Sequence, residues 1–243
     1  MRGHDCHRLL GLAPDCGCCR LGLASKVMAL IVRDLGRCPY ADALALQEEL
    51  LSRKIAGDES DYLLILEHEP VYTLGRGADA ADLLGADVAL GVPTFRIGRG
   101  GGVTFHGPGQ LVAYPIITLA HARDVHRYVC ALEEVLIRTC AAFNLAAQRR
   151  DGLTGVWVGT AKIASIGVGV RRWTTLHGVA LNVSTDLRFF AQVVPCRMPE
   201  VRMTSMWQEL GSPPAMADVQ RAFVAAFRSV FGFHAAAQQE CCA

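Results

Sequence analysis

The chain has 243 residues, of which 51% are apolar and 19% charged, and its formal net charge is +1. A chain of this size can bury a full core, and its balanced charge gives no overall attraction to nucleic acid or to an anionic membrane. No apolar run approaches the roughly 20 residues of a membrane helix and no secretory signal is recognisable, so we expect a cytoplasmic protein.

The first 27 residues differ from the rest because they show no sustained hydrophobic period. We predict that residues 1–27 are a mobile extension, from an upstream mis-start or a weak transit peptide, and that residues 28–243 form one domain. Four of the ten cysteines lie in this segment, three of them in a C-x-C-C arrangement. Structural zinc sites prefer paired C-x-x-C spacing, so we predict no metal site.

From Met28 onward, strands and helices alternate irregularly. Apolar patterns predict strands at 28–36, 61–70, 71–75, 93–97, 103–105 and 110–119, a helix at 40–56, and a short alanine-rich helix before 93. A helix begins after Asp124, which can cap it, and carries a predicted buried stripe of Val125, Val129, Leu132, Leu136, Cys140 and Phe143. Strands follow at 155–159, 161–170 and 174–183, and a last helix at 216–231. Short connections favour antiparallel neighbours, so we predict an α+β fold with a mixed, largely antiparallel sheet and packed helices.

The stretch RGGGVTFHGPGQ, residues 99–110, places glycines on both sides of a short strand. Glycines remove the Cβ and let the backbone adopt positive φ, so Gly100 to Gly102 can approach a ligand closely. Two tight turns then bracket His106. His106 and His177, each taken alone, are more typical of hydrogen-bonded structural residues than of catalytic bases.

Two further residues, a lysine and a cysteine, have side chains that could react. Lys162 is the only charged residue within 161–170. Its stem can simply lie along apolar surface with the ammonium in water, or the ammonium can sit beside a thiol and lower the pKa of that thiol. Cys196 lies in the proline-flanked loop VVPCRMP. By position alone an inert cysteine is the more common interpretation, and a nucleophile is the alternative.

Seven blocks of sequence, taken together and in order, resemble the lipoyl(octanoyl) transferases. They are LEHEPVYTLGR, RGGGVTFHGPGQLVAYPI, DVHRYVCALEEV, GLTGVWVG, AKIASIG, LHGVALNV and VVPCRMPEVRMTSM. The resemblance covers about Met28 to Leu210. Gly102 stands where this family more often has a polar residue, and Arg197 stands where glycine is more usual. These departures leave rate and substrate preference open without removing a reacting group.

The resemblance implies an enzyme that moves an octanoyl group from octanoyl-acyl carrier protein to a lysine of lipoyl domains. The acceptors would be the lipoyl domains of 2-oxoacid dehydrogenase complexes and the glycine cleavage H protein. It implies Cys196 as nucleophile, Lys162 as its acid/base partner, no cofactor, and the fold of biotin and lipoate protein ligases; we expect a monomer. The acyl-binding residues that it implies are Arg99, Gly100, Gly101, Gly102, Val103, Thr104, Phe105, His106, Ser165, Ile166, Gly167, Gly178, Val179 and Ala180.

Three other functions remain open from the sequence. An ATP-dependent lipoate ligase of the same fold needs no cysteine nucleophile. The sequence has no G-x-x-x-x-G-K-[ST] phosphate loop, although ligases of this fold need not carry one. A noncatalytic acyl-carrier or lipoyl-domain binding protein would keep the pocket without needing both Cys196 and Lys162. A cysteine hydrolase would release free octanoate, but no convincing Cys-His-Asn arrangement supports it.

Overall fold

The computed structural model describes residues 29–83, 91–119, 123–193 and 201–233. The predicted extension of residues 1–27 lies outside these ranges, and so do Cys196 and Arg197. The assignment of residues 28–243 to one domain therefore stays a prediction.

The main sheet of the described residues contains seven strands. Across the sheet these are β1 (Leu30–Cys38), β2 (Asp61–His68), β6 (Gln110–Ile116), β10 (Thr174–Asn182), β9 (Ala161–Arg171), β8 (Leu153–Val158) and β7 (Gln148–Arg150). Only the β1–β2 pair among them is parallel. Parallel neighbours need a crossover, which helix α1 (Tyr40–Ile55) supplies here. The predicted mixed, largely antiparallel sheet with packed helices is therefore confirmed.

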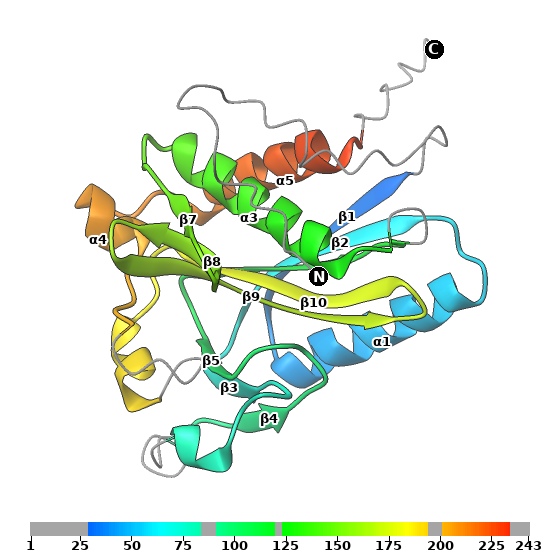
Figure 1. Ribbon diagram of the computed structural model, residues 1–243, viewed down its shortest axis with the longest axis horizontal. Helices are drawn as coiled ribbons and strands as arrows, with labels where there is room; N and C mark the ends of the chain where they lie inside the picture. The colour runs from blue at the N-terminus through cyan, green and yellow to red at the C-terminus, as the bar shows by residue number, and fades with distance from the viewer. Residues whose placement is uncertain (1–28, 84–90, 120–122, 194–200, 234–243) are drawn as a thin grey trace, which may run out of the picture.

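A smaller sheet carries the glycine-rich stretch. Its three described strands are β4 (Thr94–Arg96), β3 (Val71–Leu74) and β5 (Val103–His106), with β3 in the middle. The chain from β4 to β5 contains Arg99 to Gly102, so this sheet holds both ends of the glycine loop. In Figure 1 the small sheet lies below the main sheet, on the same side as α1. The 3₁₀ helices η2 (Ala80–Leu83) and η3 (Leu187–Gln192) complete this part of the fold.

Helices cover both faces of the main sheet. Helices α3 (Val125–Ala141) and α5 (Met216–Phe231) pack side by side over one face, and α1 covers the other (Figure 1). The largest buried cluster lies under α3 and α5, and a second one, including Leu50 and Leu64, lies under α1. The short helix α4 (Met206–Leu210) lies beside β7 and β8 in Figure 1. None of the described helices has both the length and the apolar character that crossing a membrane requires.

Helix α3 confirms the predicted cap but corrects the predicted stripe. Asp124 accepts a hydrogen bond from the backbone N–H of Arg127 at 2.9 Å, as an N-cap should. Leu132, Leu136 and Cys140 are fully buried, whereas Val125 is 38% exposed. The first turn of α3 therefore extends past the sheet, and its first apolar residue faces solvent. Strand β7 and the short helices α4 and η3 were not predicted.

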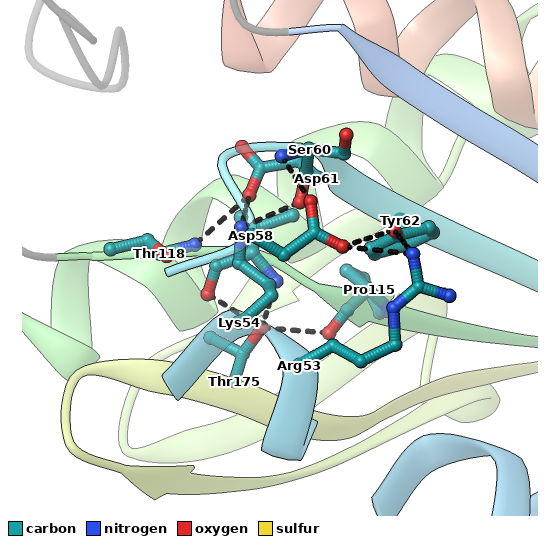
Figure 2. Close-up of polar contacts among 10 residues, drawn as sticks. Arg53, Lys54, Asp58, Ser60, Asp61, Tyr62, Pro115, Thr118 and Thr175 are labelled. Carbon is teal, nitrogen blue, oxygen red and sulfur yellow. Dashed lines mark hydrogen bonds and ion pairs between the residues drawn. The ribbon is translucent and has the colours of Figure 1, made fainter. Parts of the chain in front are cut away.

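A buried ion pair fixes α1 to the main sheet (Figure 2). Lys54 Nζ lies 2.7 Å from Asp61 Oδ1 and donates to the Ser60 carbonyl, also at 2.7 Å. Asp61 further accepts from the backbone N–H of Thr118, just beyond the end of β6. Burial raises the pKa of Asp61, against the attraction of Lys54. The stability of this ion pair therefore depends on both Lys54 and Asp61 being charged.

We expect Lys54→Met to lower the free energy of unfolding by about 3–5 kcal/mol, because it leaves the Asp61 carboxylate buried without a cation. The double variant Lys54→Met, Asp61→Asn should recover most of that loss, since the amide oxygen still accepts from Thr118. Urea unfolding at pH 7 measures both. The loss in the single variant should also shrink as the pH falls, because protonated Asp61 carries no charge. Equal losses in the single and double variants would contradict this account.

Candidate functional site

A cavity of about 400 Å³ lies between the glycine loop and the main sheet. Most of the residues that the sequence singled out line it, although they come from β5, β9, β10 and the loop before β5. Those that line it are Arg99, Gly100, Gly101, Val103, Thr104, His106, Lys162, Ser165, Ile166, Gly167, Gly178, Val179 and Ala180. The fold thus gathers residues from three separate sequence blocks at one cavity.

Gly102 and Phe105 do not line the cavity. The Gly102 carbonyl accepts from the backbone N–H of Gly75 at 3.1 Å, which closes the loop onto the end of β3. The ring of Phe105 stacks on that of Phe189 with centroids 4.4 Å apart, in the core of the small sheet. Both residues shape the wall of the cavity from behind, and their predicted contact with an acyl group stays a prediction. Cys196 lies outside the described residues.

The glycine loop is held against β9 by its backbone. The Gly100 N–H donates to the Val168 carbonyl at 2.9 Å. At Gly167 a Cβ atom would lie 2.8 Å from Cδ of Arg99 and 3.2 Å from the Gly100 carbonyl oxygen. A side chain at Gly167 would therefore push the loop away from the strand. This close approach is the reason that the site requires glycine here.

Arg99 begins a series of buried hydrogen bonds. Its Nη2 donates to the backbone carbonyl of Thr73 at 2.7 Å and to the Thr73 hydroxyl at 2.9 Å. The Thr73 hydroxyl lies 3.4 Å from His106 Nε2, and His106 Nδ1 lies 2.7 Å from Gln110 Oε1. Because Gln110 Oε1 can only accept, His106 must donate through Nδ1, and its Nε2 then accepts from Thr73. The series therefore requires a neutral His106.

The series continues across the main sheet to Lys162. Gln110 Nε2 donates to Asn182 Oδ1 at 3.0 Å, and Asn182 Nδ2 donates to the Thr204 carbonyl at 2.9 Å. The Thr204 N–H in turn donates to the carbonyl of Lys162 at 2.9 Å. The N–H of Lys162 donates to the Arg202 carbonyl at 2.8 Å. The backbone of Lys162 is thus fixed by the segment that follows residues 194–200 in the chain.

Two buried histidines, His106 and His177, line the cavity, and the ring of His68 lies 5.7 Å from that of His106; all three resist protonation. Burial, together with the neighbouring His68, lowers the pKa of His106 to about 3. Burial likewise lowers the pKa values of His68 and His177 to about 4. His68 lies 2.9 Å from the Cys38 carbonyl through Nδ1 and 2.7 Å from the Tyr114 hydroxyl through Nε2. Its Nδ1 therefore donates and its Nε2 accepts. At neutral pH these histidines are uncharged hydrogen-bonding groups.

Tyr40, Tyr114 and His177 are among the lining residues that were not predicted as site residues. Tyr40 is the first residue of α1, and no local pattern relates it to the glycine loop. Tyr114 lies inside the glycine-rich block, where its alternation along β6 could have signalled a role. His177 adopts φ of +57°, which is uncommon for a residue other than glycine, and its N–H donates to Gln47 Oε1. The sequence signal that could have indicated His177 as a site residue was its position next to Gly178.

The charged lining residues of the cavity, among the described residues, are Arg99 and Lys162. Both are largely buried, at 7% and 4% exposure. A cavity with two cations and apolar walls favours an anionic reactant such as a thiolate, because nearby positive charge lowers the pKa of a thiol. Within the described part of the chain, no group of three or more His, Cys, Asp or Glu side chains is arranged to hold a metal ion.

Comparison with known proteins agrees with this geometry. A family model described as the lipoyl protein ligase A/B catalytic domain matches residues 39–228. The chain is 47% identical over 199 residues to an octanoyltransferase of Geobacter metallireducens, covering 82% of this chain and 92% of the relative. It is 48% identical over 216 residues to an octanoyltransferase of Rubrobacter xylanophilus, covering 86% and 97%.

A solved structure shows the same fold. The bi-partite lipoate protein ligase of Thermoplasma acidophilum, from a study with its E2 lipoyl domain, superposes with a TM-score of 0.68 at 19% identity. The superposition covers 84% of each chain. At this identity the likeness establishes the fold alone, and it confirms the fold class that the sequence predicts.

The buried histidines predict how stability depends on pH. The unfolded chain binds protons at these histidines near pH 6.5, whereas the folded chain does so only near pH 3 to 4. Stability should therefore be full above pH 6.5 and fall as the pH drops from 6.5 toward 4. His68→Gln, which can keep both hydrogen bonds, should reduce that slope by about 1.4 kcal/mol per pH unit. Urea unfolding between pH 4 and 7 tests this, and an unchanged slope in His68→Gln would refute it.

Proposed function

The chain belongs to the lipoyl protein ligase A/B catalytic-domain family, and within it to the octanoyltransferases; on that premise we propose its substrates and its reacting residues. The donor is octanoyl-acyl carrier protein, and the acceptor is a lysine of lipoyl domains, including those of 2-oxoacid dehydrogenase complexes and the glycine cleavage H protein. Cys196 is the nucleophile and Lys162 its acid/base partner. The enzyme works as a cytoplasmic monomer.

The reaction has two acyl transfers. In the first, the thiolate of Cys196 attacks the thioester carbonyl carbon, and the bond from that carbon to the carrier sulfur breaks. In the second, the amine of the acceptor lysine attacks the new thioester, the bond to Cys196 sulfur breaks, and an amide forms. The amine loses a proton in this step, and Lys162 is placed to take it once it has given its own proton to a departing thiolate. Each step starts from a thioester, so no ATP is consumed.

The observation that carries the proposal is an apolar cavity whose charged lining residues, in the described part of the chain, are the cations Arg99 and Lys162. The segment after Cys196 supports it, because Val201 and Met203 line the same cavity and Met203 pairs with Lys162 in a β-bridge. Val193, on the other side of Cys196 in sequence, is buried in the core of the small sheet. Both described flanks of the cysteine segment are thus anchored near the cavity.

The same cavity accounts for an acyl substrate. Val103, Ile166 and Val179 line it together with the backbone of the glycine loop. Burying about seven methylene and methyl groups at about 0.8 kcal/mol each contributes on the order of 5 kcal/mol. Such a contribution separates acyl chains that differ by one or two carbons. Specificity for the octanoyl group then depends on the depth of the cavity.

We expect wild-type protein mixed with octanoyl-acyl carrier protein, without nucleotide, to gain the mass of one octanoyl group on Cys196. The adduct should be lost when a lipoyl domain is added, and Cys196→Ser should form no thioester. Intact-mass spectrometry with peptide mapping measures both. An ATP-dependent lipoate ligase would instead show transfer only with ATP and free octanoate or lipoate. Transfer by Cys196→Ser at the wild-type rate would rule out Cys196 as nucleophile.

Lys162→Ala should slow acylation of Cys196 at pH 7 by about 100-fold or more, because it removes the cation that favours the thiolate. The pKa of the thiol should then move toward its ordinary value of about 8.5. Part of the lost rate should return as the pH is raised through 8.5, where the thiol ionises unaided. Single-turnover acylation rates between pH 6 and 10 measure this. An equal rate ratio at every pH would show that Lys162 does not act through the thiolate.

A further inference from the structure

Lys162 lies directly opposite Trp157. Strands β8 and β9 are antiparallel, and their register pairs these two residues. Paired residues of neighbouring strands project to the same side, where their side chains meet. Trp157 is fully buried, and Nζ of Lys162 lies 5.6 Å from the centroid of its ring. This distance is within the range of a cation–π contact, and the guanidinium of Arg150 on β7 also lies over this ring, 5.0 Å from its centroid.

The end of the Lys162 side chain lies in a space that is open because β8, the strand of Trp157, has a glycine there. Gly155 lies two residues before Trp157 and has a φ of +128°. A Cβ atom there would fall 2.5 Å from Cε of Lys162 and 3.1 Å from its Nζ. The Gly155 N–H donates to the buried carboxylate of Glu133 on α3 at 3.1 Å, which fixes this part of β8. The end of the lysine side chain thus passes directly over the main chain of β8.

A register shift between β8 and β9 places the side chains of Trp157 and Lys162 opposite each other. Val156 pairs with Ala164, but Trp157 pairs with Lys162, so Ile163 is an extra residue on β9. Such bulges redirect side chains and are frequent next to active sites. Beyond the bulge, both backbone groups of Lys162 are bonded to Arg202 and Thr204. The bulge, Gly155 and the Trp157 ring all border the space that the end of the Lys162 side chain occupies.

We propose that Trp157 is the positioning residue for Lys162, holding its ammonium over the indole face at the cavity wall and keeping it protonated. The inference rests on the proposed role of Lys162. Burial at 4% exposure favours the neutral amine, whereas the negative face of the indole ring favours the cation. Trp157 therefore offsets the effect of burial on the pKa of Lys162. A purely structural tryptophan would fill the core without affecting the proton on Lys162.

The test compares substitutions that separate ring electrostatics from packing. Trp157→Phe keeps an aromatic face, and Trp157→Leu keeps an apolar side chain without one. The chain contains only three lysines, Lys26, Lys54 and Lys162, so trace acetylation followed by peptide mapping resolves each amine. Lys54, held by its ion pair with Asp61, serves as the internal control for an intact fold.

In Trp157→Leu the pH at which Lys162 reaches half of its limiting reactivity should fall by about 0.5 to 1 unit. The shift should be clearly smaller in Trp157→Phe, and the reactivity of Lys54 should not change. The alkaline limb of the acylation rate should move to lower pH by the same amount. Equal shifts in Phe and Leu, no shift, or a shift to higher pH would overturn the proposal.

Replacement of tryptophan by fluorinated analogues covers the case in which Trp157→Leu fails to fold. Each fluorine weakens the negative face of the ring with little change in volume, so the half-reactivity pH of Lys162 should fall stepwise with fluorine number. A flat response would overturn the proposal. The labelling readout needs no turnover, so it is separate from the proposed function. Wild-type protein that forms no octanoyl adduct would refute the function, whereas a failed labelling result refutes only the role of Trp157.

Discussion

The cavity depends on one series of buried hydrogen bonds that joins the small sheet to the main sheet. It runs from Arg99 through Thr73, His106 and Gln110 to Asn182, and then through the backbone of Thr204 to Lys162. Each group has one role, because the amide oxygen of Gln110 makes His106 Nδ1 the donor, and the Thr73 hydroxyl then donates to His106 Nε2. A series in which each polar group has its partner specifies one arrangement of the two sheets.

Charge and burial in the cavity follow from that arrangement. The three histidines around it stay neutral because they are buried, and Arg99 adds to this for His106 and His177. Positive charge at the cavity wall is therefore confined, among the described lining residues, to Arg99 and Lys162. Arg99 is committed to backbone and hydroxyl acceptors on β3 and in its own loop, whereas Lys162 extends over β8. The two cations are thus suited to different tasks, one to holding the loop and one to proton transfer.

The sequence predicted the elements well and the site only in part. Helices α1, α3 and α5 and the long strands were readable because apolar periodicity is a local property. Tyr40 was not predicted as a site residue, since its approach to the glycine loop arises from the packing of α1 on a distant part of the chain. Phe105 was predicted with its neighbours on β5, and its ring packs against Phe189 in the core of the small sheet, so its contact with an acyl group stays a prediction. The pairing of Trp157 with Lys162 depends on a register shift that no single strand reveals.

The glycines that line the cavity also limit how its shape can change in evolution. Gly100, Gly101, Gly167 and Gly178 present main chain to the interior, and a residue without a side chain cannot be trimmed further. Point substitution at these positions can only narrow the cavity. A wider one would require the strands themselves to separate. The width of the cavity at this wall is therefore set by the geometry of the strands. Selection for a bulkier substrate would have to act on the side chains that line the opposite wall.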